Sequence, residues 1–298
     1  MSTYEMKNEF LTVKVKSFGA ELISIINNET KEEYLWNGDE RYWKRNAPVL
    51  FPIVGSLKNG RYIYGGKEYP MGQHGFARDM EFELLGEAKD KLSFVLKADA
   101  ETLEKYPFMF ELYIDYVLEG SKLKVNWRVV NVDKKTMYFS IGGHPAFMCP
   151  LGDRGKQSDY YLLFDTPKNL EYGKLSENGL LAEKYLELNT NGGVLKIDEH
   201  LFDDDALIIE DEQTKTVSLA GPDRKAYLTV QFDTPLVGLW SPAKKNAPFV
   251  CIEPWNGRCD SEDFVGELKD REFGNSLEPG EEFESGYDII IRFYDDVK

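Results

Sequence analysis

Hydrophobic and polar residues alternate with a period of two along most of the chain. Residues 11–15, 123–129, 228–232 and 289–293 place hydrophobic side chains at every second position. A strand with this pattern buries one face and exposes the other, which is typical of antiparallel sheets. Asn-Gly pairs supply the positive φ angles of tight hairpins, so we expect a hairpin around Asn59-Gly60. Turn-forming residues separate the predicted strands: Asn27-Asn28, Asn59-Gly60, Gly65-Gly66, Glu119-Gly120, Asn191-Gly192-Gly193 and Pro222-Asp223.

Helical periodicity is rare. Residues 100–105, which precede Pro107, and residues 260–268 predict two short helices. Strands do not alternate with longer helices, so a parallel sheet of βαβ units is disfavoured. No internal repeat and no long Ser-, Pro- or Gly-rich linker divides the chain. We therefore predict an all-β protein in which residues 1–298 form a single domain, a large antiparallel β-sandwich with a few short peripheral helices.

The amino-acid composition limits the kinds of molecule that the protein is expected to bind. The chain has 298 residues, of which 42% are hydrophobic and 30% charged, as in soluble globular proteins. Its formal net charge of −16 would repel phosphate backbones and anionic lipids, so we expect neither a nucleic-acid nor a membrane partner. Aromatic residues make up 13% of the chain, which favours strands first and sugar-binding clefts second.

Cysteine usage and the N-terminal residues predict a cytoplasmic location. The cysteines, Cys149, Cys251 and Cys259, are odd in number and widely spaced, so they predict no disulfide framework. The first residues contain neither a basic segment nor an apolar run, so we expect no secretion signal. No apolar run in the chain reaches transmembrane length.

The stretch from Gly142 to Phe147 carries the first candidate functional residue. Hydrophobic residues 137–141 predict a strand that runs directly into it. The glycines permit backbone angles that other residues avoid, and Pro145 restricts His144 to an extended conformation. We therefore expect His144 to be held stiffly at the end of a strand, as one member of a functional site.

His74 and Glu253 are its predicted partners. His74 lies among glycines, prolines and aromatic residues, which fits either a cleft wall or a hydrogen-bonded structural histidine. Glu253 follows an apolar strand that we expect Pro254 to end, and Cys251 would share its face of that strand. Burial there would raise the pKa of the carboxyl group, whereas a nearby cation would lower it. The alternative is a solvated glutamate at a strand end.

Familiar catalytic signatures are missing. The chain has no G-x-S-x-G, Walker loop, dinucleotide-binding G-x-G-x-x-G or H-E-x-x-H motif. His74, His144 and His200 share no short metal-binding spacing, so we expect no metal ion. General acid–base catalysis by a carboxylate and an imidazole is the chemistry that these residues still allow. Near neutral pH it would require an ionised Glu253 and a protonated His144, and would give a bell-shaped pH profile.

Four motifs together resemble the galactose mutarotase-like superfamily, the aldose 1-epimerases, and within it the LacX-like bacterial branch. They occur in the family's order and span most of the chain. The family fold is a large β-supersandwich, in agreement with the strand pattern. The motifs are Asn46-Ala47-Pro48-Val49-Leu50-Phe51-Pro52-Ile53-Val54-Gly55, Gln73-His74-Gly75-Phe76-Ala77-Arg78, Gly142-Gly143-His144-Pro145-Ala146-Phe147 and Cys251-Ile252-Glu253-Pro254-Trp255.

The resemblance implies a cofactor-free epimerase that acts at the anomeric carbon of an aldose. Glu253 resembles the family's general base, which takes the proton of the C1 hydroxyl group. His144 resembles the general acid, which protonates the ring oxygen. The ring then opens, rotates and closes on its other face. His74 resembles the second family histidine, which holds the sugar and polarises the ring oxygen.

The remaining predicted substrate-binding residues are Arg78, Asp205, Trp255 and Arg61. Arg78 is similar to an arginine that lines the pocket in one branch, and Asp205 to an acidic residue that binds sugar hydroxyls. In related sequences an arginine commonly follows the glycine of the first motif, but Ser56 occupies that place here. Arg61 or Arg78 would then have to compensate.

Other functions fit the same residues. A carbohydrate-binding or sensing protein without catalysis would use the same scaffold. A glycoside hydrolase or lyase would pair Glu253 with Asp205 or Asp260, because hydrolysis usually requires two carboxylates. A phosphorylated hexose would require basic residues at the mouth of the cleft. The candidates for that role are Lys58, Arg61, Lys67 and Arg78. The oligomeric state stays open between monomer and homodimer.

Overall fold

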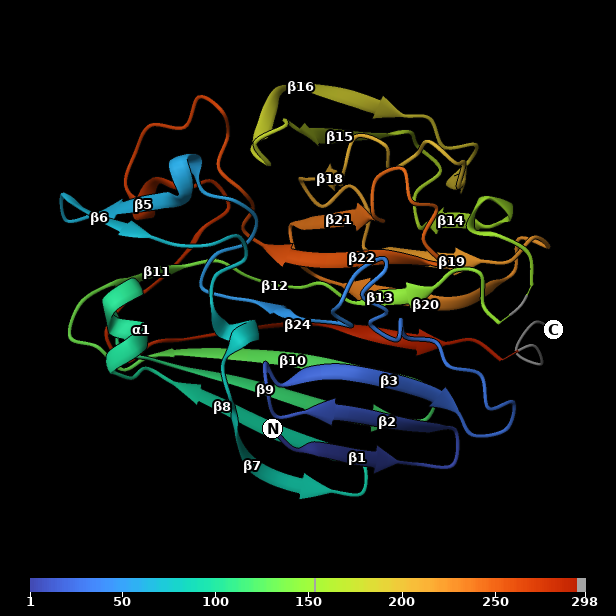
Figure 1. Ribbon diagram of the computed structural model, residues 1–298, viewed down its shortest axis with the longest axis horizontal. Helices are drawn as coiled ribbons and strands as arrows, with labels where there is room; N and C mark the ends of the chain where they lie inside the picture. Colours follow the sequence, from blue (N-terminus) through green and yellow to red (C-terminus); the bar gives the residue numbers. More distant parts are fainter. Residues whose placement is uncertain (153, 294–298) are drawn as a thin grey trace.

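Two large antiparallel sheets pack against each other and hold most of the strands (Figure 1). The computed structural model describes residues 1–152 and 154–293. The nine-stranded sheet has the order β17-β14-β19-β20-β24-β10-β9-β8-β7. Its strands are β7 (Glu83–Ala88), β8 (Lys91–Lys97), β9 (Phe110–Glu119), β10 (Lys122–Asn131), β14 (Tyr161–Phe164), β17 (Val194–Lys196), β19 (Thr216–Ala220), β20 (Ala226–Phe232) and β24 (Glu282–Ile291).

The eight-stranded sheet has the order β16-β15-β18-β21-β22-β12-β4, and β13 pairs with β22 beside β12. Its strands are β4 (Val49–Leu50), β12 (Ile141–Gly143), β13 (Ala146–Met148), β15 (Leu170–Leu175), β16 (Leu181–Leu188), β18 (Leu207–Ile209), β21 (Leu236–Trp240) and β22 (Phe249–Asn256). The central position of β22 makes this strand the natural support for a functional site.

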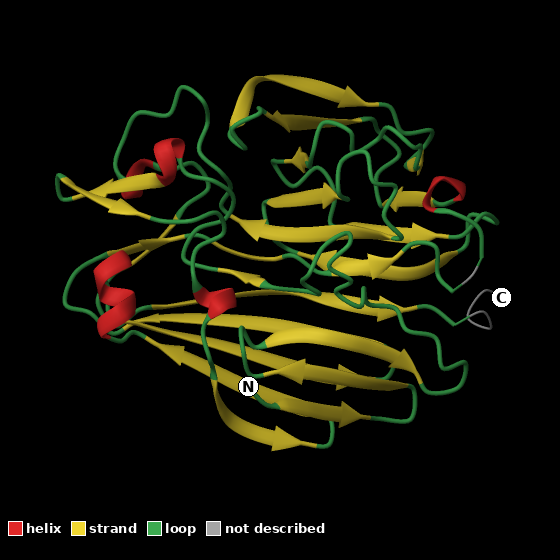
Figure 2. Ribbon diagram, in the orientation of Figure 1, coloured by secondary structure: helices red, strands yellow, loops and turns green. Residues whose placement is uncertain are grey.

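Smaller elements complete the β-rich fold. Three sheets are formed by β1 (Thr3–Lys7), β2 (Leu11–Lys16) and β3 (Glu21–Asn27), by β5 (Arg61–Tyr64) and β6 (Lys67–Pro70), and by β11 (Met137–Phe139) and β23 (Asn275–Leu277). The short helices lie at the periphery (Figure 2). They are α1 (Ala100–Lys105) and the 3-10 turns η1 (Lys58–Gly60), η2 (Ala77–Asp79), η3 (Gln157–Asp159) and η4 (Leu268–Asp270). The predicted fold class is thus confirmed.

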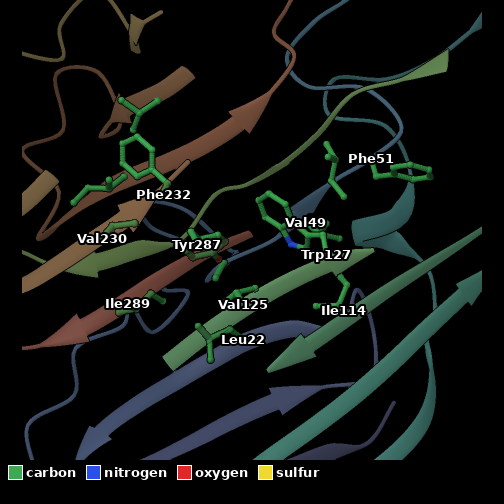
Figure 3. Close-up of a cluster of buried hydrophobic side chains, with 14 of the residues drawn as sticks. Leu22, Val49, Phe51, Ile114, Val125, Trp127, Val230, Phe232, Tyr287 and Ile289 are labelled. Carbon is green, nitrogen blue, oxygen red and sulfur yellow. The ribbon is translucent and has the colours of Figure 1, made fainter. Parts of the chain in front are cut away.

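The alternating pattern builds one core from several sheets. Along β9 and β10, buried and more exposed residues alternate as the sequence predicts. Figure 3 shows the inward side chains Ile114, Trp127 and Tyr287 of the nine-stranded sheet beside Val49 of β4 and Leu22 of β3. Because Trp127 is 2% exposed, its large apolar surface contributes fully to this core.

Strand β22 continues through Pro254, which the sequence analysis expected to end it. Pro254 pairs with Val237 of β21 on one side. On its other side the neighbouring chain changes from β13 to β12, and the residues between those strands include Pro145. A proline lacks the amide proton of a regular ladder, so it is tolerated at such an interruption.

Two other local predictions were wrong. Asn59-Gly60 forms the 3-10 turn η1, and the hairpin between β5 and β6 turns at Gly65-Gly66. Residues 260–267 form no helix, because the carboxylate of Asp260 binds the amide of Lys58 and the guanidinium of Arg271 instead of capping a helix. Residues 100–105 do form the predicted helix. Within the described residues, no helix is long and apolar enough to cross a membrane.

Candidate active site

His144 and Glu253 face each other because of strand register. Ile141 and Gly142 of β12 pair with Asn256 and Trp255, and Ala146 of β13 pairs with Cys251, so one register continues across the interruption. That register places His144 directly opposite Glu253. Side chains opposite each other on paired antiparallel strands lie close together. The Nε2 atom of His144 is 3.2 Å from Oε2 of Glu253.

The two glycines before His144 provide space rather than unusual backbone angles. Neither Gly142 nor Gly143 has a positive φ angle, which corrects the expectation from the sequence. A Cβ atom at Gly142 would lie 2.5 Å from the Trp255 ring, and one at Gly143 would lie 2.8 Å from the Tyr287 ring. The glycines therefore let two aromatic rings pack against β12.

His74 is held by the backbone of the first motif. The amide of His74 donates to the carbonyl of Gly55, and the amide of Gly55 donates to Nδ1 of His74 at 3.1 Å. Because Nδ1 accepts a hydrogen bond, a neutral imidazole carries its proton on Nε2. His74 thus offers a fixed donor, and its ring centroid lies 5.6 Å from that of His144.

A pocket of about 210 Å³ joins these residues. It contains the predicted His74, Arg78, His144, Asp205, Glu253 and Trp255. Its other lining residues, which were not predicted as site residues, are Trp43, Gly55, Gln73, Leu175, Gly179, Ala206, Ile208, Trp240 and Cys259. The Trp43 ring stacks on His144, with centroids 4.7 Å apart. Polar groups beside aromatic faces suit a ligand with both hydroxyl groups and C–H faces.

Arg61 and Ser56 lie outside this lining. The guanidinium of Arg61 pairs with Glu68 at 3.0 Å on the β5–β6 hairpin, which corrects its predicted place in the site. The hydroxyl group of Ser56 points towards Gly179, where an added Cβ atom would lie 3.0 Å away. A long side chain at position 56 would therefore collide with the turn at Gly179 unless that turn moved.

Arg78 is the cation that lines the pocket. Its guanidinium donates to the carbonyl of Gln73 at 2.7 Å, and its Nε atom is buried without a hydrogen-bond partner. Burial lowers its pKa to about 10, so the group stays charged at neutral pH. A charged donor with spare hydrogen-bonding capacity can bind a ligand oxygen.

Burial favours the uncharged forms of the central pair. It raises the pKa of Glu253 well above its usual range, and the Asp205 carboxylate acts in the same direction. Burial lowers the pKa of His144 far below its usual range, and the charge of Arg78 adds to the effect. The expectation of an ionised glutamate beside a protonated histidine is thus opposed by burial. Burial instead favours a protonated Glu253 beside a neutral His144.

Both members keep unused hydrogen-bonding capacity. Nδ1 of His144 is buried without a hydrogen-bond partner, and Oε2 of Glu253 makes its 3.2 Å contact with Nε2 of His144 but no hydrogen bond of good geometry. Buried polar atoms are rarely left unsatisfied, so these atoms are poised for a ligand. The thiol of Cys251 lies beside them, since Cys251 and Glu253 are two residues apart on β22. Donor atoms of His144, Cys251 and Glu253 lie within 4.8 Å of one another, a spacing that could hold a metal ion.

A larger groove of about 980 Å³ runs along the nine-stranded sheet, away from these residues. Two of its carboxylates are already paired, Asp115 with Lys91 at 2.9 Å and Asp288 with Lys122 at 2.6 Å. The groove contains neither histidine nor a buried glutamate. The smaller pocket is therefore the better candidate for catalysis despite its size.

The chain is similar to known proteins over nearly its whole length. The model of a family described as aldose 1-epimerase matches residues 2–289. The plasmid-encoded Protein LacX of Lactococcus lactis subsp. lactis is 37% identical over 301 residues, which cover 97% of this chain and 99% of that protein. Its chromosomal counterpart is 36% identical over the same shares.

Solved structures share the whole fold. A galactose mutarotase related enzyme from Lactobacillus acidophilus superimposes with a TM-score of 0.93 at 37% identity, over 98% of each chain. A galactose mutarotase-like protein from Lactobacillus casei gives a TM-score of 0.91 at 29% identity, over 98% of this chain and 100% of that one. The family match, residues 2–289, spans every segment that lines the pocket.

Proposed function

The chain belongs to the aldose 1-epimerase family, and from this membership we propose that the protein interconverts the α and β anomers of an aldose. The observation that carries the proposal is the 3.2 Å approach of His144 Nε2 to Glu253 Oε2 at the pocket. The O1 and O5 atoms of a pyranose share the C1 carbon, so two groups this close can reach both oxygens at once.

In the proposed reaction, Glu253 takes the proton from the C1 hydroxyl group while His144 gives a proton to the ring oxygen. The C1–O5 bond breaks, C1 becomes a carbonyl carbon, and the C1–C2 bond rotates. Ring closure on the other face returns both protons by the reverse steps. His74 donates from Nε2 and holds a sugar oxygen, and Arg78 supplies a second, charged donor.

The single proton of the pair suits this exchange of roles. A carboxylic acid beside a neutral imidazole contains as many protons as a carboxylate beside an imidazolium. Glu253 can therefore pass its proton to His144 without exchange with solvent. Hydroxyl groups of a bound sugar would stabilise the charged arrangement by hydrogen bonding to the carboxylate, which lowers its pKa.

An unphosphorylated monosaccharide is the proposed substrate. The pocket volume of about 210 Å³ is below the roughly 300–1,000 Å³ of pockets for drug-sized ligands. Of the cations considered for a phosphate group, only Arg78 lines the pocket. Arg61 pairs with Glu68, Lys58 donates to the carbonyl of Phe264, and Lys67 lies over a tyrosine ring.

The contacts of the two possible second carboxylates weaken the hydrolase alternative. Asp260, one possible second carboxylate, is buried in an ion pair with Arg271 at 2.7 Å and is absent from the pocket. Asp205 does line the pocket, but its Oδ1 atom accepts the amide of Ala206. The absence of reducing-end release from disaccharides would agree with the epimerase proposal.

Exchange NMR on anomerically pure glucose and galactose tests the proposal. We expect accelerated interconversion by the wild-type protein. The variants Glu253→Gln and His144→Asn should each lose at least about 100-fold in kcat/KM, since each removes one general acid–base group. Glu183→Gln, on the exposed face of β16, is the matched control and should be unaffected. Sugar binding without accelerated interconversion would instead support the sensor.

A further inference from the structure

Cys251 lies behind the lining of the pocket, beside His144 and Glu253, and has no role in the proposed reaction. It lies opposite Ala146 and on the same face of β22 as Glu253. Its thiol is free and fully buried. Cys251, Glu253 and His144 each offer one donor atom, and these three atoms lie within 4.8 Å of one another.

The donors match a thiophilic divalent ion. Zinc binds cysteine sulfur at about 2.3 Å, histidine nitrogen at about 2.0–2.1 Å and carboxylate oxygen at about 2.0–2.2 Å. Around one tetrahedral ion such donors lie roughly 3.3–3.7 Å apart. A separation at the upper limit of 4.8 Å would therefore have to shorten by about 1.1–1.5 Å, shared between two side chains. Magnesium and calcium prefer shells of oxygen atoms, so a thiol at this position disfavours them.

A second observation points to a ligand at the same place. Glu253 is 1% exposed and His144 is 7% exposed, and Oε2 of the first lies 3.2 Å from Nε2 of the second, so one ion can bind both atoms. Both residues line a pocket that opens to solvent, which gives an ion a route of entry. With three protein ligands, the fourth position of a tetrahedral ion stays open for water.

We propose that Cys251, Glu253 and His144 form a binding site for Zn²⁺ or Cd²⁺, and that the bound ion blocks the pocket. Binding releases the thiol proton and the proton that Glu253 and His144 share, so two protons go to solvent. The bound ion then coordinates the Glu253 carboxylate and the His144 imidazole, which are the groups that would bind a sugar. The binding part stands without any assumption about activity, whereas the blocking part rests on the proposed function.

Titration of the full-length protein with CdCl₂ tests the binding part, because a cadmium–thiolate bond gives a charge-transfer band in the ultraviolet. We expect one Cd²⁺ per chain, and a thermal transition that Cd²⁺ raises. Cys251→Ser should lose the band and bind Cd²⁺ at least about 100-fold more weakly, because loss even of an outer-shell partner costs about 10–100-fold. Cys251→Ala serves as a second variant in case the serine hydroxyl destabilises the buried position.

Cys149→Ser is the matched control, because Cys149 is equally buried but is not part of the group formed by His144, Cys251 and Glu253. This variant should keep the band. Equal Cd²⁺ affinity in wild type and Cys251→Ser would overturn the site, and so would a band that disappears in Cys259→Ser instead. MgCl₂ should give no change in thermal transition.

Activity then tests the blocking part. We expect Cd²⁺ or Zn²⁺ to stop anomer interconversion by the wild-type protein, and a chelator to restore it. Full catalysis with a cadmium ion bound would overturn the blocking part. A protein that binds cadmium through Cys251 but never interconverts anomers would refute the proposed function and leave the metal site standing.

Discussion

At the scale of single residues, burial determines the chemistry of Glu253 and His144. Both side chains lie in the same pocket, and burial opposes the charged form of each. Removing water also strengthens every hydrogen bond that a ligand makes there. The pair can therefore combine one acid and one base over a wide range of pH.

This state of protonation predicts the pH profile of kcat/KM. The active form of the pair holds one proton. The pair gains a second proton only when acid protonates His144, and it loses its proton only when base ionises Glu253. Because burial lowers the first pKa and raises the second, we expect a broad plateau on both sides of pH 6.5, the ordinary value for histidine. Initial-rate measurements across that range check it. A steep rise or fall centred near pH 6.5 would show an ordinary histidine instead.

Glu253 also predicts a stability that depends on pH. Its pKa is raised in the folded protein, so its contribution is fully present below the unfolded pKa of about 4.3 and is lost as pH rises towards the folded pKa. Glutamine does not titrate. We therefore expect Glu253→Gln to raise the Tm relative to wild type, by a margin that grows as the pH rises above the unfolded pKa of about 4.3. Thermal melts followed by circular dichroism give the margin, and a constant margin would contradict the expectation.

At the scale of elements, β12 positions His144 only because its glycines admit the neighbouring rings. Gly143→Ala would place a Cβ atom 2.8 Å from Tyr287, so we expect a loss of about 1–3 kcal/mol in the free energy of unfolding. The shift of β12 should also lower kcat. Gly86→Ala in β7 is the control, since a Cβ atom there meets nothing within 4 Å. Urea unfolding compares the two, and equal stabilities would argue against close packing at β12.

Sequence reasoning works best where the physical cause is local. Alternation predicted the strands, and the segment ending before Pro107 predicted α1. Glycines at positions 142 and 143 were recognised, but a sequence alone does not distinguish a need for space from a need for positive φ. The contact of Trp43 with His144 gave no signal, since Trp43 lies in a loop without periodicity. The register of β12 against β22 depends on distant pairing, which local patterns do not encode.

At the scale of the whole molecule, a buried ion pair links distant segments behind the pocket. Arg271 binds Asp260 at 2.7 Å, and both side chains are 3% exposed. Arg271 also donates to the hydroxyl group of Ser140, while Asp260 accepts the amide of Lys58. These contacts support the chain around Gly55, which in turn holds His74.

Removal of one partner should be costly. Arg271→Met leaves Asp260 buried without its cation, so we expect a loss of about 3–5 kcal/mol in the free energy of unfolding. The double variant Asp260→Asn with Arg271→Met should recover part of that loss. Lys91→Met, which breaks a surface pair with Asp115, should cost less than about 1 kcal/mol. Chemical denaturation measures all three, and additive effects in the double variant would contradict coupling.

The opposed placement of His144 and Glu253 on neighbouring strands has a consequence for refolding. A cut at the exposed turn around Gly192 would leave the two side chains on different fragments of the polypeptide. Neither fragment would contain both His144 and Glu253. Catalysis could therefore return only after the fragments associate and β12 and β13 pair with β22 in the correct register. Catalytic activity would then report correct pairing between distant strands. Circular dichroism reports the content of strands and does not distinguish correct from incorrect pairing.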